Sequence, residues 1–154
     1  DPNLVDEGIN KFLDEKCDYL TNSTGKFPHG VDFSIFTFSM LEKTWKNARL
    51  LSEKEHVIPY MEKKENKFNT IFLKNESDQS KFRITLDWTE DLELLRILVD
   101  KIKSRPILVH DVTTYLENNP NLLKINEGHH KEEGYLKSLK KDKISNKRMV
   151  DSNE

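Results

Sequence analysis

Short apolar segments with the alternation of a β-strand are interleaved along this chain with segments that have the periodicity of an amphipathic helix, and this order limits the possible folds most strongly. The clearest strand pattern is residues 31–38, where polar and apolar side chains alternate. The clearest helical pattern includes Leu95, Val99 and Ile102, which recur at intervals of three to four residues. Strands interleaved with helices predict an α/β or α+β fold.

Similar patterns predict an element for most of the chain. The apolar segment 82–86 ends at Asp87, so a strand, a carboxylate and a helix follow one another there. The expected helices lie at residues 2–16, from Ser39 to about Ala48, after Ser52, at 92–102 and at 112–117, and the expected strands lie at 18–21, 31–38, 68–73 and 82–86.

The chain begins at Asp1 without an initiator methionine and enters a helical pattern at once. We therefore expect an upstream part of a larger fold to be missing, including strands that complete the sheet. A length of 154 residues has the size of one domain. We expect this domain over residues 1–140, followed by a basic, mobile tail at 141–154.

The charge balance argues against nucleic acid as a partner. The 25 basic and 27 acidic residues nearly cancel, so the chain has no strong field to attract a polyanion. A single cysteine, Cys17, cannot form an internal disulfide, and no apolar run reaches the length of a membrane span. These features predict a cytoplasmic protein that does not bind a membrane.

Asp87 is the strongest candidate for chemistry, because it follows a predicted strand at the edge where open α/β sheets bind ligands. Mg²⁺ prefers oxygen ligands and takes one or two protein carboxylates together with substrate phosphates, so Asp87 needs a partner. The spacing of Asp87 and Glu90 also fits a capping box, which needs no metal. From the local sequence both interpretations remain open.

Two other segments contain residues suited to a polar sugar, whose hydroxyl groups need donors and acceptors. Glu55 and His56 stand in a crowded charged segment just before a Pro-Tyr pair. Gly30 permits a close approach of backbone to ligand, and Asp32 can accept hydrogen bonds from hydroxyl groups. A charged helical turn and a turn before a strand, respectively, explain the same segments without a ligand.

The remaining candidates are weaker. His129 and His130, followed by Glu132 and Glu133, lack the spacing of a zinc motif, so we expect a solvated charged turn. The five glycines are scattered singly, so the chain has no glycine-rich loop for phosphate. A nucleotide must therefore be bound upstream or not at all.

Five segments carry a resemblance to a known family. They are Asp-Pro-Asn-Leu-Val-Asp-Glu at 1–7, Pro-His-Gly-Val-Asp at 28–32, Ser-Glu-Lys-Glu-His-Val-Ile-Pro-Tyr at 52–60, Asp-Trp-Thr-Glu-Asp-Leu at 87–92 and Glu-Gly-Tyr-Leu-Lys-Ser-Leu at 133–139. In this order they resemble the second half of the spore-coat polysaccharide cytidylyltransferases, relatives of the acylneuraminate and 3-deoxy-manno-octulosonate cytidylyltransferases. The segment 52–60 is the most specific, since it is similar to the family's Ser-Glu-Arg-Glu-His-Val-Thr-Pro-Tyr.

The resemblance implies an α/β, Rossmann-like nucleotidyltransferase fold, of which this chain is the carboxy-terminal portion without the amino-terminal nucleotide-binding strands. In such enzymes a sugar oxygen attacks the α-phosphate of CTP, which forms a CMP-sugar and releases pyrophosphate, while Mg²⁺ neutralises charge. The resemblance implies Asp87 as a metal ligand. It implies Gly30, Asp32, Glu55 and His56 as substrate-binding residues, and it leaves the catalytic residue unassigned.

Residues 27–65 resemble the part of these enzymes that forms dimers, so a homo-oligomer is expected and this segment is the candidate for dimerisation and sugar binding. Three departures from the family pattern bear on the interpretation. His29 replaces an acid, Ser34 replaces a common Glu and Thr89 replaces a Pro. The first two leave the identity of the sugar open.

Two interpretations of function follow. In the first, the chain is a piece of a cytidylyltransferase of surface polysaccharide or glycan biosynthesis and is catalytic only when complete. In the second, it is a non-catalytic interaction or dimerisation module derived from such an enzyme. The family's amino-terminal Gly/Arg/Lys nucleotide loop and its first metal carboxylate have no counterpart in these 154 residues.

Overall fold

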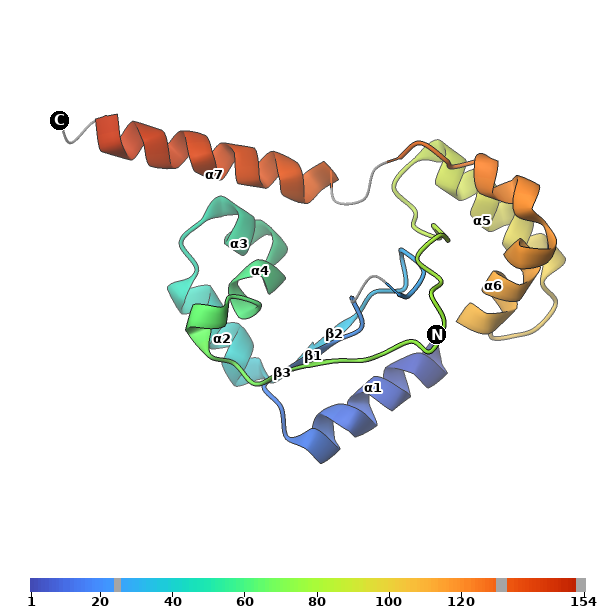
Figure 1. Cartoon of the computed structure of the whole chain (residues 1–154), viewed down its shortest axis with the longest axis horizontal. Coiled ribbons are helices and arrows are strands. Elements are labelled where there is room, and N and C mark those ends of the chain that lie inside the picture. Colours follow the sequence, from blue (N-terminus) through green and yellow to red (C-terminus); the bar gives the residue numbers. More distant parts are fainter. Residues whose placement is uncertain (24–25, 130–132, 152–154) are drawn as a thin grey trace. The chain divides into compact units, whose positions relative to one another are not determined.

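The computed structural model (Figure 1) describes residues 1–23, 26–129 and 133–151, and these residues fall into two compact units. Unit 1 is built from residues 1–35 and 71–129. Unit 2 is built from residues 36–70 and the carboxy-terminal helix α7 (Glu133–Asp151). The segment 27–65, predicted from the sequence to serve dimerisation or sugar binding, therefore overlaps both units.

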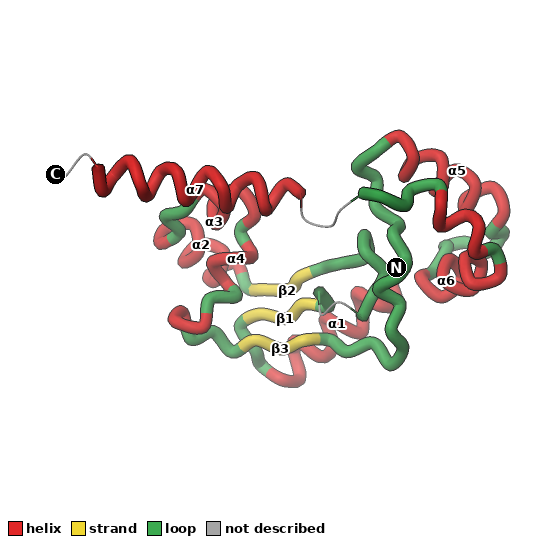
Figure 2. The backbone as a smooth tube through the Cα atoms, turned by 45° about the horizontal axis from the view of Figure 1, so that its top comes forward, coloured by secondary structure: helices red, strands yellow, loops and turns green. Residues whose placement is uncertain are grey.

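A three-stranded sheet and helix α1 (Pro2–Glu15) form the first part of unit 1. Strand β1 (Tyr19–Thr21) lies between β2 (Ser34–Phe36) and β3 (Thr70–Phe72), as Figure 2 shows. The carboxylate of Asp1 caps α1. A buried cluster links the helix to the sheet and consists of Cys17, Leu20, Phe27 and Leu73, with Leu4 and Phe12 packed against it.

Strand β2 is shorter than the alternating pattern of residues 31–38 predicted, and the buried side chain of Asn22 gives the reason. Its amide nitrogen donates to the Val31 carbonyl at 3.1 Å, and its amide oxygen accepts from the Phe33 N–H at 2.7 Å. The Asn22 side chain thus satisfies backbone groups that a neighbouring strand satisfies in a regular ladder.

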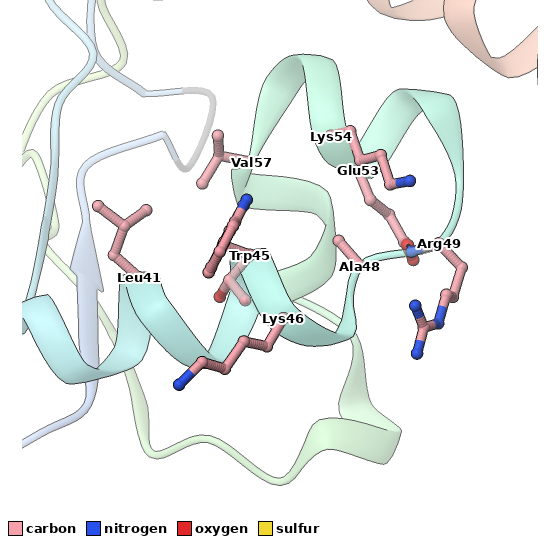
Figure 3. A pocket seen from close by; sticks show the side chains of 9 residues that line it. Leu41, Trp45, Lys46, Ala48, Arg49, Glu53, Lys54 and Val57 are labelled. Carbon is pink, nitrogen blue, oxygen red and sulfur yellow. Dashed lines mark hydrogen bonds between the residues drawn. The ribbon is translucent and has the colours of Figure 1, made fainter.

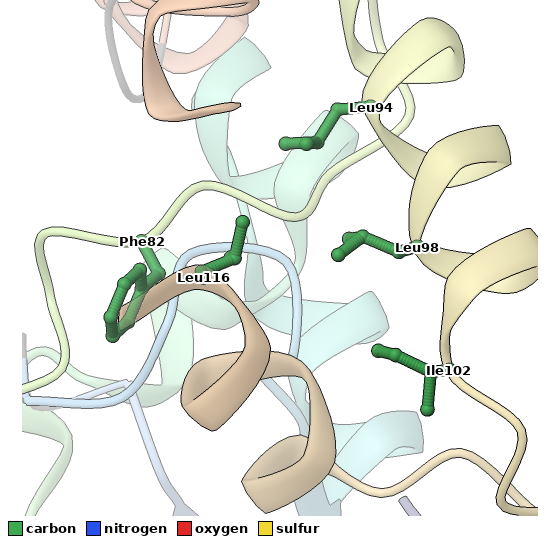
Figure 4. Packing of buried hydrophobic residues seen from close by; sticks show 5 residues of the cluster. All are labelled: Phe82, Leu94, Leu98, Ile102 and Leu116. Carbon is green, nitrogen blue, oxygen red and sulfur yellow. The ribbon is translucent and has the colours of Figure 1, made fainter. Parts of the chain in front are cut away.

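The second part of unit 1 is a helical layer formed by α5 (Thr89–Lys101), α6 (Val109–Asn118) and the short 3₁₀ helix η2 (Pro120–Lys124). The buried face of α5 is formed by Leu94 and Leu98, whereas Val99 of the predicted apolar stripe is 54% exposed. The buried side chains of this core are Phe82, Leu94, Leu98, Ile102 and Leu116 (Figure 4).

The strand predicted at 82–86 is wrong, because this segment pairs with another at a single point. Arg83 forms an isolated parallel bridge with His29. The His29 N–H donates to the Phe82 carbonyl at 2.9 Å, and the Ile84 N–H donates to the His29 carbonyl at 2.8 Å. The segment is extended without being part of the sheet, and it brings the loop around His29 next to the start of α5.

Unit 2 is helical. Helices α2 (Phe38–Asn47), α3 (Leu51–His56) and α4 (Ile58–Met61) are followed by a 3₁₀ turn, η1 (Lys64–Asn66). Thr37 caps α2 in place of the predicted Ser39, since its hydroxyl accepts from the Met40 N–H at 3.2 Å. None of the helices in the described ranges combines the length and the apolar character that a membrane crossing requires.

Helix α7 continues through residues 141–151, where the sequence predicted a tail. Asp142, an acid within this basic stretch, is buried and accepts hydrogen bonds from the Leu51 N–H at 2.8 Å and the Ser52 N–H at 3.3 Å. The first turn of a helix has unsatisfied N–H groups and favours an anion, so Asp142 fastens α7 to the start of α3. The sequence pattern did not reveal this contact, because its partners are about ninety residues apart.

Replacing Asp142 with Ala should loosen α7 from α3, because two N–H groups lose their acceptor. We expect a loss of about 1–2 kcal/mol in unfolding free energy, the usual size for a lost cap. Amide exchange at Leu51 and Ser52 should become faster while exchange in α5 stays unchanged. Lys140→Ala, an exposed change in the same helix, is the control. Unchanged exchange at both amides in Asp142→Ala would show that this contact does not hold α7.

Candidate functional site

The charged centre of unit 1 is an ion pair between Arg83 and Asp91. Asp91 stands in the first turn of α5 and its side chain is fully buried. The Arg83 Nε donates to Asp91 Oδ1 at 3.0 Å, and Nη2 donates to Oδ2 at 2.9 Å. This two-point geometry is the strong form of an arginine–carboxylate interaction, and it joins the extended segment around Arg83 to the helix.

Further donors complete the surroundings of the Asp91 carboxylate. Asn126 donates to Oδ1 at 2.7 Å and the Thr85 hydroxyl donates to Oδ2 at 3.1 Å. The backbone N–H groups of Asp87 and Trp88 donate to Oδ2 at 3.0 and 3.2 Å. Burial acts to raise the pKa of Asp91, but the hydrogen bonds from Arg83 and these other donors outweigh it and hold the pKa well below its usual range.

The capping pair predicted from Asp87 and Glu90 is therefore wrong by one residue. Asp91 accepts from the backbone at the start of α5, and Trp88 is the residue that precedes the helix. The Glu90 side chain points elsewhere, with its carboxylate 3.4 Å from His129 Nε2. A capping box joins the residue before a helix to the residue three positions later. Trp88 and Asp91 have this spacing as well as Asp87 and Glu90, so the spacing alone does not distinguish the two pairs.

Arg83 also binds the side chain of Asp87. Its Oδ2 accepts from Arg83 Nη2 at 3.1 Å, while 62% of its side chain remains exposed. On another side, Arg83 Nη1 lies 3.2 Å from His29 Nδ1. Because a guanidinium only donates, His29 Nδ1 is the acceptor and its Nε2 carries the proton in the neutral ring. Arg83 thus connects two of the segments singled out in the sequence, 28–32 and 87–92.

Gly30 makes a close approach, but to the protein's own backbone. Its φ of 110° lies in the region that favours glycine, and a Cβ atom added there meets the backbone of Ile84 at 2.7 Å. The Gly30 N–H donates to Asp32 Oδ2 at 3.3 Å. The contacts of Gly30 and Asp32 thus hold the loop in place, and their predicted contact with a substrate remains a prediction.

Glu55 and His56 lie in unit 2, where they contact α7. The Ser138 hydroxyl donates to Glu55 Oε2 at 2.6 Å and lies 3.2 Å from His56 Nε2 and from the Gly134 carbonyl. Since the single hydroxyl hydrogen faces Glu55 and Gly134, His56 Nε2 is the donor to Ser138. The ring of Tyr135 meets the His56 ring edge-on, at 5.4 Å between centroids. Two segments that carry the family resemblance, 52–60 and 133–139, therefore pack against each other.

The described residues do not form a complete magnesium site. Among them, no three or more His, Cys, Asp or Glu side chains are grouped so that they can hold a metal ion. Asp91 is occupied by Arg83 and its other donors, so Asp87 is the exposed carboxylate of this network. Arg83 supplies positive charge beside Asp87, where a metal needs anionic ligands. The assignment of Asp87 to a metal stays a prediction.

The aromatic residue after Asp87 has a partner that the sequence did not indicate. Trp88 stacks on the His129 ring with centroids 4.8 Å apart and planes 6° apart. His129 was predicted to belong to a solvated charged turn, and it is half-buried in this stack. The neighbouring His130 and Glu132 lie outside the described residues.

The sequence reasoning missed the residues that organise both centres. Arg83 was taken as part of a strand, Asp91 stood next to the residue chosen for the cap, and Asn126 carried no signal at all. Ser138 belongs to the closing segment of the resemblance, but only the fold shows that it meets Glu55. The cap spacing was the one usable signal for Asp91.

Comparison with known proteins supports the resemblance. No family model matches the chain. An uncharacterized protein of Methanocaldococcus jannaschii is 30% identical over 125 residues, which are 80% of this chain and 51% of that protein. The structure of a cytidylyltransferase from Leptospira borgpetersenii serovar Hardjo-bovis matches with a TM-score of 0.76 and 33% identity, over 84% of this chain and 56% of that one. The chain thus spans about half the length of these relatives.

These matches define the class of the fold. The described residues mix helices and strands, and their fold is similar to that of this cytidylyltransferase, which is consistent with an α/β nucleotidyltransferase-like fold. The match supports the cytidylyltransferase family that the five sequence segments resemble, at an identity that goes beyond shared architecture.

Replacing Asp91 with Asn tests the buried pair. Arg83, which is 11% exposed, then lacks its buried counter-charge, and breaking such a pair costs about 3–5 kcal/mol. The ionised carboxylate stabilises the wild type fully above about pH 5, because its pKa is lower folded than unfolded, and this stabilisation fades as the pH falls through about 4 and below.

Chemical denaturation from pH 2 to 7 measures both effects. We expect Asp91→Asn to be much less stable at pH 7 and to lose stability less steeply than the wild type below pH 5. Asp87→Asn is the matched control and should cost less than about 1 kcal/mol, since its carboxylate is mostly exposed. Equal stability of Asp91→Asn and the wild type at pH 7 would contradict the proposed role of the pair.

Proposed function

We propose that this chain is part of a sugar nucleotidyltransferase that transfers CMP from CTP to a sugar and releases pyrophosphate. The match to a cytidylyltransferase structure at 33% identity and a TM-score of 0.76 carries this proposal. The order of the five resembling segments supports it, because the fold brings four of them together in two pairs. The sugar, and a place in surface polysaccharide or glycan biosynthesis, are finer proposals that rest on the resemblance.

In this proposal the hydrogen-bond network around Arg83 lies where the phosphate groups and the sugar of the substrates bind. Arg83 holds the exposed Asp87 carboxylate and the His29 ring in defined positions. Preorganised groups of this kind stabilise developing charge because they need not reorient during the reaction. Mg²⁺ remains an expectation of the resemblance, since the described residues supply one exposed carboxylate for it.

CTP binding is assigned to the half of the relatives that this chain does not span. The sequence contains no glycine-rich phosphate loop, and the chain covers 51% and 56% of the two relatives. We therefore propose that the 154-residue chain alone does not turn over CTP. In this proposal the chain supplies the carboxy-terminal portion of the enzyme's fold. Its residues Gly30, Asp32, Glu55 and His56 bind the sugar.

Association into a homo-oligomer is a further part of the proposal. Phe38, the first residue of α2, is 80% exposed and lies within the segment 27–65 that resembles the dimer-forming part of the family. An aromatic side chain so exposed is frequent at contacts between protein chains. The same observation supports the second candidate function, a non-catalytic dimerisation module, and the activity of the complete protein separates the two.

Pyrophosphate release from CTP, with N-acetylneuraminate or 3-deoxy-manno-octulosonate as acceptor, is the test. We expect no release by the 154-residue chain and clear turnover by the complete protein that contains it. Asp87→Asn in the complete protein should reduce turnover by roughly a hundredfold, the size of losing one preorganised electrostatic contact, with little change in melting temperature. Glu90→Gln is the control and should leave turnover nearly unchanged.

The outcomes separate the parts of the proposal. Robust turnover by the chain alone would contradict the division of the site between two halves. No turnover by the complete protein with any acidic sugar would favour the dimerisation module. Normal turnover in Asp87→Asn across a Mg²⁺ titration would show that Asp87 holds neither metal nor substrate.

A further inference from the structure

Unit 2 contains a cavity of about 680 Å³, and none of the residues proposed above to bind substrate or metal lines it (Figure 3). Its volume lies within the range of about 300–1,000 Å³ typical of small-molecule sites. Helix α2 and helix α3 supply most of the wall. The lining residues are Leu41, Thr44, Trp45, Lys46, Ala48, Arg49, Glu53, Lys54 and Val57.

One polar group in this wall has no partner. Thr44 is 2% exposed, and its hydroxyl oxygen makes no hydrogen bond within the described structure. Buried polar groups are almost always paired, so an unpaired hydroxyl in the wall of a cavity indicates a missing partner there.

The charge around the cavity is positive. The described part of the chain gives neither Arg49 nor Lys54 an acidic partner for its side chain. Glu53 is the one acid in the wall, and it is already neutralised by Lys63 and by hydrogen bonds from backbone N–H groups. Burial acts to raise the pKa of Glu53, but Lys63 and the backbone donors hold it below its ordinary value, so the acid stays ionised and paired. The free charges of the wall are therefore cationic.

The rest of the wall is apolar and contains a flat aromatic surface. Trp45 is 76% exposed, an unusual exposure for the largest side chain. In Figure 3 its ring and the Val57 side chain lie at one end of the cavity and Arg49 lies at the other. Val57 has a φ of 62°, a strained conformation for a β-branched residue that concentrates at binding sites.

We propose that this cavity binds a small organic anion that combines a carboxylate or phosphate with a flat or apolar ring. Arg49 and Lys54 take the anionic group, because a guanidinium offers paired donors and an ammonium adds charge. The indole of Trp45 stacks on the ring, and the Thr44 hydroxyl gains its missing hydrogen bond. Binding here does not depend on CMP transfer, so it can be tested whether or not that activity is present.

Trp45 provides the reporter for this test. The chain has two tryptophans, so Trp88→Phe leaves Trp45 as the single source of indole fluorescence. CMP and benzoate are the two anionic probes, since one combines a flat ring with a phosphate and the other combines a flat ring with a carboxylate. Cytidine, a ring without an anion, and inorganic phosphate, an anion without a ring, are the matched comparisons.

We expect saturable fluorescence changes with CMP or benzoate at millimolar concentration or below, and a much weaker response to cytidine and phosphate. Arg49→Gln combined with Lys54→Gln should weaken binding at least tenfold. Lys74→Gln combined with Lys101→Gln removes the same charge from exposed positions of unit 1 and should leave binding unchanged. Thr44→Val should weaken binding while the protein stays folded, because valine has nearly the same shape as threonine.

Three results would overturn the proposal. The first is no response to either anionic probe up to about 10 mM. The second is equal binding by the wild type and the Arg49/Lys54 double variant. The third is a Trp45 emission already typical of a buried indole in a chain that sediments as a dimer, because the cavity is then covered by a second copy of the chain.

Discussion

At the start of α5, a buried carboxylate faces a nearly buried guanidinium, and the arrangement of the candidate site in unit 1 depends on this pair. Asp91 accepts from Arg83 at two points and from the backbone that opens the helix. Arg83 in turn reaches Asp87 and His29. A charge placed in the interior is costly unless it is paired and fully hydrogen-bonded, so the surrounding segments must take the positions that supply those donors. The pair therefore fixes where Asp87 and His29 lie.

The sequence predicted the helices well because their apolar periodicity is local. The helix expected at 2–16 is α1, and the helix expected at 92–102 is α5, although Val99 of its predicted apolar stripe is 54% exposed. It predicted the strands less well, because strand length depends on partners far along the chain. Residues 31–38 alternate throughout, yet the side chain of Asn22 replaces a strand neighbour for part of them. No local pattern contains that information.

The same distinction explains the outcome for the candidate site. The segments 28–32, 52–60 and 87–92 were found from their residues and from a family resemblance, and the structure gives each a polar network. The sequence did not show that Arg83 joins two of them or that Ser138 joins the third to α7. Glu55 and His56 were expected to face a sugar, and the structure shows them in contact with α7, so any sugar contact comes in addition to that packing.

A double-mutant cycle between Arg83 and Asp91 tests most directly whether this pair organises the site. The unfolding free energies of the wild type, Arg83→Gln, Asp91→Asn and the double variant are measured at pH 7 by chemical denaturation. We expect a coupling energy of about 2 kcal/mol or more, since the two side chains are buried together and each single variant leaves the other charge unpaired. A coupling energy below about 0.5 kcal/mol, the level of residues that do not interact, would contradict the account.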